Sequence, residues 1–165
     1  MKLKLFTAIL ALAGSAVQAQ MVEVQNAWVR STVPGQQGTG AFMSLMARDG
    51  AKLVGASSPA AGIVEVHEMK MEGDIMKMRA VPVLELPAGQ TVQLKPGSYH
   101  FMLTDLKQPL AKGSKVPLTL HLKDASGAPS SLELTLPVAT VAPFANAGST
   151  PGHDGAAAQF SGQKH

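Results

Sequence analysis

The sequence predicts an all-β domain, a sandwich or small barrel of mostly antiparallel strands. Short alternating runs rich in apolar and β-branched residues are separated by clusters of Gly, Pro, Asp and Ser. No stretch keeps a helical period, and several short strands at this spacing are typical of sandwiches and barrels. The candidate strands are residues 22–31, 40–47, 53–56, 63–71, 75–81, 91–94, 99–103, 116–123 and 131–137.

Two of these runs show the strand period most cleanly. In 116–123, every second residue is apolar and the residues between are Pro, Thr, His and Lys. In 99–103, two aromatic residues and a leucine share one face, which leaves His100 and Met102 together on the other face. We therefore expect His100 and Met102 to point away from the core.

The two ends of the chain read differently from the domain. Residues 1–19 combine a basic start, a short apolar run and small residues before Ala19, which predicts a secretory signal peptide and a periplasmic location. After its removal we expect no stable membrane insertion. Residues 20–139 are the predicted domain. Residues 140–165 are rich in Ala, Gly, Ser and Pro, and we expect a disordered tail there.

Composition excludes several classes of function. The chain has no cysteine, so it has no disulfide framework, no blue-copper thiolate and no thiol nucleophile. The predicted mature chain has twelve basic and eleven acidic residues, because Lys2 and Lys4 lie in the leader. We find no basic stripe with interleaved aromatics, which argues against nucleic acid. No G-x-S-x-G, H-E-x-x-H or phosphate-binding loop is present, so we do not expect an enzyme.

Residues 64–78 (VEVHEMKMEGDIMKM) crowd four methionines around one histidine, His67. We expect a hairpin here, with a two-residue loop at Glu72-Gly73 or a four-residue loop in the same register. Either loop sets His67 directly opposite Met78, with Cβ atoms about 5 Å apart. A three-residue loop would slip the register by one and separate the potential ligands onto different faces.

Two imidazole–thioether pairs thus arise, His67 with Met78 and His100 with Met102. If their strands meet, the four side chains form a site that favours monovalent copper. Zinc sites use thiolate, imidazole and carboxylate instead. The competing interpretation is that the methionines fill the core, which is their commoner use. The roles of the other three hairpin methionines stay open at this point: Met69, Met71 and Met76.

The pattern His67-x10-Met78-x21-His100-x-Met102 resembles the motif of the periplasmic copper chaperones called PCuAC. The resemblance covers roughly residues 22–138 and is strongest in residues 97–110 (GSYHFMLTDLKQPL). It departs at Glu68, where the family motif allows methionine. The resemblance implies a cupredoxin-like β-barrel or sandwich that binds one Cu(I) through these four residues.

The resemblance also implies a function and a partner. A PCuAC-like protein would deliver copper to an acceptor, such as the CuA centre of cytochrome c oxidase or another chaperone. The alternatives are a copper-buffering or resistance protein without a dedicated oxidase acceptor, and a metal-free β-sandwich interaction module. Cu(II) binding by tail residues His153 and His165 is a further hypothesis, set against a simple solvated tail.

Overall fold

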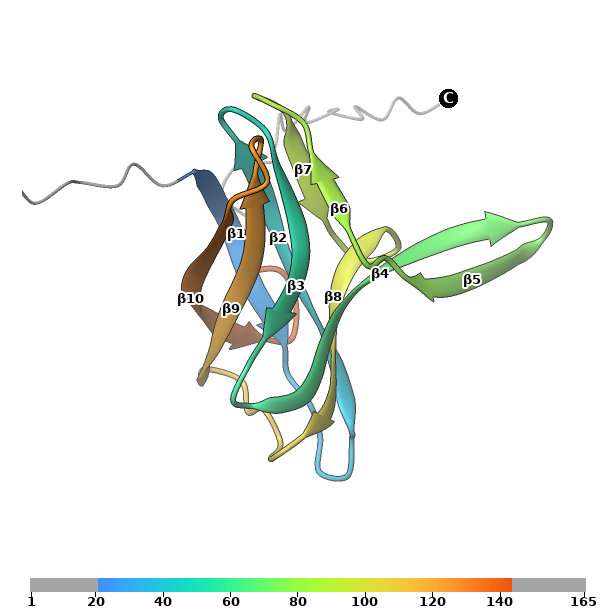
Figure 1. The fold of residues 1–165 in the computed structure, drawn as a ribbon. Helices are drawn as coiled ribbons and strands as arrows, with labels where there is room; N and C mark the ends of the chain where they lie inside the picture. The colour runs from blue at the N-terminus through green and yellow to red at the C-terminus, as the bar shows by residue number, and fades with distance from the viewer. Residues whose placement is uncertain (1–20, 144–165) are drawn as a thin grey trace, which may run out of the picture.

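The computed structural model describes residues 21–143 and confirms the all-β fold class. The strands form two facing layers of a sandwich, and one long hairpin projects from it (Figure 1). The strands are β1 (Val22–Arg30), β2 (Gly38–Ala47), β3 (Ala51–Ser57), β4 (Ala61–Glu72), β5 (Ile75–Ala80), β6 (Leu84–Leu86), β7 (Thr91–Leu94), β8 (Tyr99–Leu106), β9 (Lys115–Asp124) and β10 (Pro129–Ala139).

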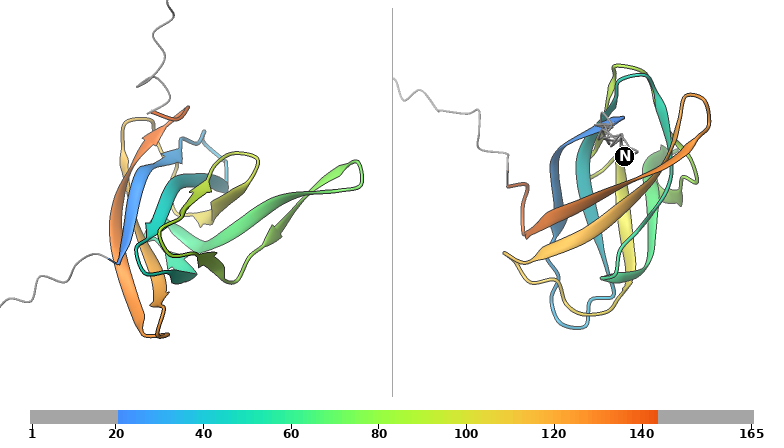
Figure 2. Two further views of the ribbon diagram at one scale, coloured as in Figure 1. Left: turned by 90° about the horizontal axis from the view of Figure 1, so that it is seen from above. Right: turned by 60° about the vertical axis from the view of Figure 1, so that its left-hand side comes forward.

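The strand order explains how the layers are joined. One layer runs β5-β4-β8-β2-β1, with β7 also paired to β2, and the other runs β10-β9-β3-β6. The layers meet through β1 and β10, which are parallel, with Val29 opposite Val138. The sheet path ends at β5 and β6 without closing, so the fold is a sandwich and not a closed barrel. Figure 2 shows the two layers from other directions.

The core lies between the layers and follows the period of the strands. In β9 every second residue is buried, as the sequence predicts. In β8, Phe101 and Leu103 are fully buried, while Met102 between them faces the outside of the sandwich. Each such leucine or phenylalanine contributes about 1.5–3 kcal/mol through removal of apolar surface from water. The core therefore fixes which side of β8 is left for function.

The predicted strands are recovered, with one addition. The sequence reading missed β6, a three-residue strand between Pro82 and Pro87 that is too short to show an alternating pattern. Strands β4 and β8 also extend beyond their predicted ends. These extensions lengthen the pairing of β4 with β8, which runs from Ala61 opposite Leu106 to Glu68 opposite Tyr99.

The register of the β4–β5 hairpin corrects the prediction. His67 lies opposite Ala80, and Met78 lies opposite Met69, so the predicted direct His67–Met78 pairing is wrong. The turn is centred one residue later than expected because Gly73 takes the first central position with φ 64°. A positive φ at that position is what a primed hairpin turn requires. The shift is by an even number of residues, so every side chain stays on its predicted face.

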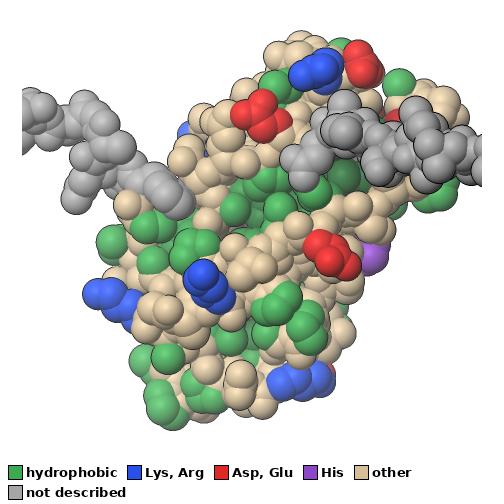
Figure 3. Space-filling model, turned by 90° about the vertical axis from the view of Figure 1, so that its left-hand side faces the viewer, with side chains coloured by type: hydrophobic (Ala, Val, Ile, Leu, Met, Phe, Trp, Pro, Cys, Tyr) green, Lys and Arg blue, Asp and Glu red, His purple; other side chains and the backbone are tan. Residues whose placement is uncertain are grey.

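Some predictions fall outside the described residues. The signal peptide (1–19) and the part of the tail beyond residue 143, including His153 and His165, are among them. Within residues 21–143, no helix is long and apolar enough to cross a bilayer. On the face shown in Figure 3, acidic and basic side chains are scattered among apolar ones, and neither sign forms a continuous patch there.

Candidate metal centre

The outer face of the β4–β8 pair brings the two predicted histidines together. His67 on β4 lies directly opposite His100 on β8. Their ring centroids are 6.1 Å apart, with an angle of 60° between the ring planes. These residues lie far apart in the sequence, and the pairing of two neighbouring strands makes them adjacent.

The hydrogen bond of His100 fixes its tautomer. Its Nδ1 lies 3.0 Å from the carbonyl oxygen of Ser98. A carbonyl oxygen can only accept, so Nδ1 carries the hydrogen and Nε2 keeps its lone pair. The side chain points away from the core, as predicted, but its neighbours cover it and leave the residue 8% exposed. His100 is thus held in one orientation with one free ring nitrogen.

His67 has the complementary arrangement. Its Nε2 lies 3.1 Å from a carboxylate oxygen of Glu65, which accepts the hydrogen bond. Its Nδ1 is buried, and no residue of the described chain offers it a hydrogen-bond partner. A buried polar atom without a partner costs about 1–3 kcal/mol, so such atoms need an explanation. One explanation is that the lone pair of Nδ1 is a ligand for a metal ion. In metal sites the second nitrogen of a ligating imidazole is usually hydrogen-bonded to a carboxylate or carbonyl, as Nε2 of His67 is here.

The spacing of the two rings agrees with a shared ion. A metal ion bonded to two imidazole nitrogens at about 2 Å holds the ring centroids at most about 6 Å apart. The observed 6.1 Å is at that limit. The two histidines are therefore close enough to share one ion.

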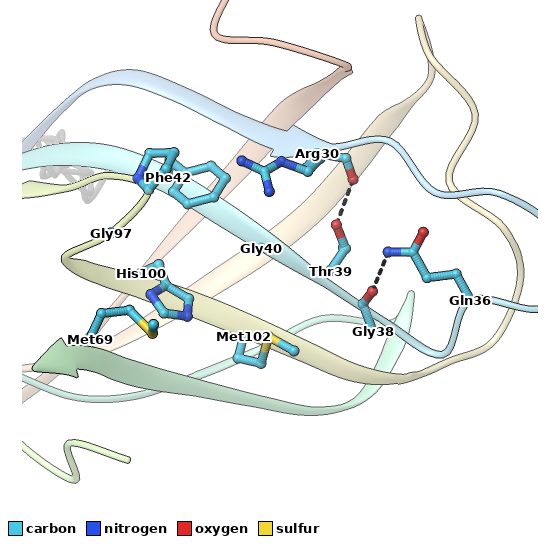
Figure 4. A pocket seen from close by; sticks show the side chains of 11 residues that line it. Arg30, Gln36, Gly38, Thr39, Gly40, Phe42, Met69, Gly97, His100 and Met102 are labelled. Atoms are coloured by element: carbon cyan, nitrogen blue, oxygen red, sulfur yellow. Dashed lines mark hydrogen bonds between the residues drawn. The ribbon is translucent and has the colours of Figure 1, made fainter. Parts of the chain in front are cut away.

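Thioether sulfur reaches the same region from two strands. Met102 and Met69 line a pocket of 330 Å³ together with His100, and Figure 4 shows their side chains on either side of the imidazole. Met102 lies opposite Glu65 on one side and opposite Gly40 on the other. Residues 21–143 contain no cluster of three or more His, Cys, Asp and Glu placed to hold a metal. The donors gathered here are imidazoles and thioethers.

Met78 is the predicted ligand that lies furthest out. It sits on β5 opposite Met69, two residues along the strand from Ala80, the partner of His67, and it is 48% exposed. Diagonal neighbours across a strand pair are about 7–8 Å apart, which long side chains can span. The structure thus brings His67, His100 and Met102 to neighbouring positions of the β4–β8 pair, and leaves Met78 on the same face as the diagonal neighbour of His67.

An aromatic wall closes the other side of the pocket. Trp28 and Phe42 stack with centroids 4.9 Å apart, and Phe42 is 6.4 Å from the ring of His100. The guanidinium of Arg30 lies 5.3 Å above the ring of Phe42, within cation–π range. A Cβ on Gly40 would lie 2.8 Å from Phe42, so this position needs glycine if the wall is to keep its place.

Sequence reasoning did not single out this wall. The segments 27–30 and 40–42 hold its residues, but only strand pairing shows that they stand beside His100. The sequence left the role of Met69 undecided, and in the structure this residue lines the pocket. The alternation of β4 was the available signal, because it puts Met69 on the face of His67.

Charged residues brace the hairpin on the opposite face. Arg79 donates to a carboxylate oxygen of Glu68 at 3.1 Å, and Lys77 pairs with Glu72 at 2.7 Å. This pairing follows from the observed register, which sets Glu68 opposite Arg79. Burial first, and then the charge of Glu68 and a hydrogen bond from the Tyr99 hydroxyl to its carboxylate, raise the pKa of Tyr99. These contacts tie β5 to β4 and β4 to β8.

Comparisons with known proteins agree with this description. A family model described as "Putative lipoprotein LpqE-like" matches residues 22–138. "Putative lipoprotein Lxx21020" of Leifsonia xyli subsp. xyli (strain CTCB07) is 35% identical over 113 residues, 68% of either chain.

Solved structures point to the same fold. The solution structure of CuI-DR1885 from Deinococcus radiodurans is 34% identical, with a TM-score of 0.57 over 76% of this chain and 83% of that one. The copper-bound PCuAC domain from PmoF2 is 17% identical, with a TM-score of 0.55 over 72% of this chain and 94% of that domain, and it bears on the fold alone. The cupredoxin-like sandwich that the resemblance implied is confirmed. The chain belongs to the LpqE-like lipoprotein family and has the fold of PCuAC domains.

Proposed function

We propose that the protein is a copper carrier of the periplasm, which binds one Cu(I) through His67, Met78, His100 and Met102 and passes it to an acceptor protein. The observation that carries the proposal is the pair of facing imidazoles, each with one nitrogen bonded and the other free. Neutral imidazoles and thioethers suit a soft monovalent ion. A relative at 34% identity, DR1885, has a solved structure titled as its CuI form.

The chemistry of the donors suits a carrier better than a permanent cofactor site. Thioethers and imidazoles are neutral, so they release Cu(I) by one-for-one exchange with the donors of an acceptor. No electron is transferred in such an exchange. The open side of the site, where Met78 is half exposed, lets an acceptor approach without unfolding the sandwich. Because imidazole must be neutral to bind, acidification should favour release.

The acceptor and the location are extensions of the same proposal. The family name and the Leifsonia relative both carry the word lipoprotein, which supports export to the cell envelope. The predicted leader at 1–19 supports the periplasm. The CuA centre of cytochrome c oxidase is the proposed acceptor, and transfer of Cu(I) from the loaded protein to a purified CuA-bearing domain tests it. Failure of that transfer, with Cu(I) binding intact, would favour a copper buffer.

The test of binding is an anaerobic Cu(I) titration of the full chain against a competing chelator. We expect one tightly bound Cu(I). In His100→Ala we expect the Cu(I) affinity to fall by more than the ~10–100-fold that removal of a group supporting a ligand costs. His121→Ala is the matched control, because this histidine lies on β9 and bonds to Ser57 at 3.0 Å, away from the site. No uptake of Cu(I), or equal affinities in both variants, would refute the proposal and favour a metal-free interaction module.

A further inference from the structure

The projecting hairpin carries more sulfur than the histidine site needs. Two methionine pairs lie directly across it, Met69 with Met78 and Met71 with Met76. All four share the face of His67, since residues at alternate positions and directly opposed residues point the same way. The second pair is next to the turn, beyond the reach of the histidines. This face, from His67 to the turn, is called the sulfur face below.

Packing does not explain the sulfur face. Met71, Met76 and Met78 are 54%, 46% and 48% exposed, so they fill no core. The hairpin projects from the sandwich in both Figure 1 and the left view of Figure 2, and among the strands of residues 21–143 only β8 pairs with it. Large apolar side chains gathered on an exposed surface indicate a site of interaction.

The charges of the hairpin are sorted away from the sulfur. By the observed register, Glu68, Lys70 and Glu72 share the other face with their partners across the hairpin, Arg79, Lys77 and Ile75. The sulfur face itself holds only methionines, His67 and Ala80. Between Met69 and the turn, the opposed pairs on this face hold no carboxylate to offset the charge of a divalent cation, and Glu65, which reaches His67 at 3.1 Å, lies on the other side of that histidine along β4. Neutral thioethers select a soft monovalent ion.

We propose that Met71 and Met76 form a second, weaker site for Cu(I) near the hairpin turn, and that the Met69–Met78 pair links it to the histidine site. Directly opposed residues have Cβ atoms about 4.5–5.5 Å apart. The three rotatable bonds of methionine let two such sulfurs converge on one ion. The site would receive Cu(I) at the exposed end and pass it inward, or the reverse on delivery.

Movement along the sulfur face needs only ligand exchange. At each step one sulfur–copper bond forms as another breaks, and the ion stays Cu(I). No proton moves, because thioethers carry none, and no oxidant or reductant is required. The role in transfer rests on the proposed function, in which copper is the cargo. The soft-metal site itself can be tested independently of that function.

The experiment is a titration of the full chain, labelled with carbon-13 at the methionine methyl groups, with Ag(I) as a redox-inert substitute for Cu(I). Each methyl signal is assigned by substitution with leucine, which conserves volume. We expect the first equivalent to shift Met102 and Met78, and the second to shift Met71 and Met76. In the double variant Met71→Leu/Met76→Leu, we expect loss of the second equivalent with the first unchanged.

Two controls separate the outcomes. Met46→Leu removes a methionine on β2, away from the hairpin, and should leave both equivalents in place. In His100→Ala the first equivalent should weaken while Met71 and Met76 still respond. The second site is refuted if the methyls of Met71 and Met76 stay unshifted through the second equivalent, or if the double variant still binds it. The proposed carrier function fails separately, if no equivalent shifts Met102.

Discussion

Replacing Glu65 with alanine should lower the Cu(I) affinity about tenfold, through the tautomer of His67. The carboxylate of Glu65 accepts the hydrogen of Nε2 at 3.1 Å, which keeps the lone pair on the buried Nδ1. Without that acceptor the hydrogen can move to Nδ1 and block the bond to copper. Supporting groups of this kind contribute about 10–100-fold in metal affinity, and the lower end applies because the Glu65 side chain is 54% exposed.

The fold should tolerate the change, because an exposed ion pair contributes about 0–1 kcal/mol. Glu85→Ala is the matched control: Glu85 forms an ion pair of the same 3.1 Å length with Lys52 and is 64% exposed, on strands of the other layer. Affinity is measured anaerobically against a competing Cu(I) chelator, and stability by urea unfolding. Glu65→Gln keeps an accepting oxygen and should bind nearly as the unaltered chain does. If Glu65→Ala binds Cu(I) as tightly as Glu85→Ala, the tautomer reasoning is wrong.

Three further outcomes follow from burial and hydrogen bonding. Met78→Ala should weaken Cu(I) binding while changing the free energy of unfolding by less than about 0.5 kcal/mol, because the side chain is half exposed; an unfolded variant would contradict this. Phe101→Ala should lower the free energy of unfolding in urea by about 3–5 kcal/mol, because the ring is fully buried. A decrease no larger than that of a surface substitution would contradict the assignment of Phe101 to the core. Hydrogen bonds from the Ser126 hydroxyl and then the Ala128 amide lower the pKa of Asp124. These bonds therefore stabilise the folded state at neutral pH, where Asp124 is ionised, and this contribution disappears as pH falls through the folded-state pKa. The stability difference between the unaltered chain and Asp124→Ala should therefore shrink on acidification, and a constant difference would refute the assignment.

The alternation of side chains along each strand made it possible to predict from the sequence which residues face the core and which face outward. Phe101 in the core and Met102 outside follow from alternation alone, and so does the shared face of His67 and the hairpin methionines. The even shift in hairpin register left these faces unchanged. Which residues lie directly opposed was not predictable, because that depends on whether Gly73 takes the first or the second place in the turn.

The neighbours of the site could not be predicted, because they depend on strand order. Nothing in the local pattern says that β8 lies between β4 and β2, and this order alone puts His100 between His67 and Phe42. The orphaned Nδ1 of His67 is likewise a property of three-dimensional packing. Local chemistry identified the donors, and long-range pairing determined which of them meet.

The central claim is that two imidazoles and two thioethers bind the same cuprous ion. X-ray absorption at the copper edge of the protein loaded with one equivalent of Cu(I) tests this most directly, because nitrogen and sulfur neighbours scatter at different distances. The account predicts two nitrogen and two sulfur neighbours, with one nitrogen lost in His67→Ala and one in His100→Ala. A shell of nitrogen alone or of sulfur alone, or a shell unchanged in both variants, would contradict it.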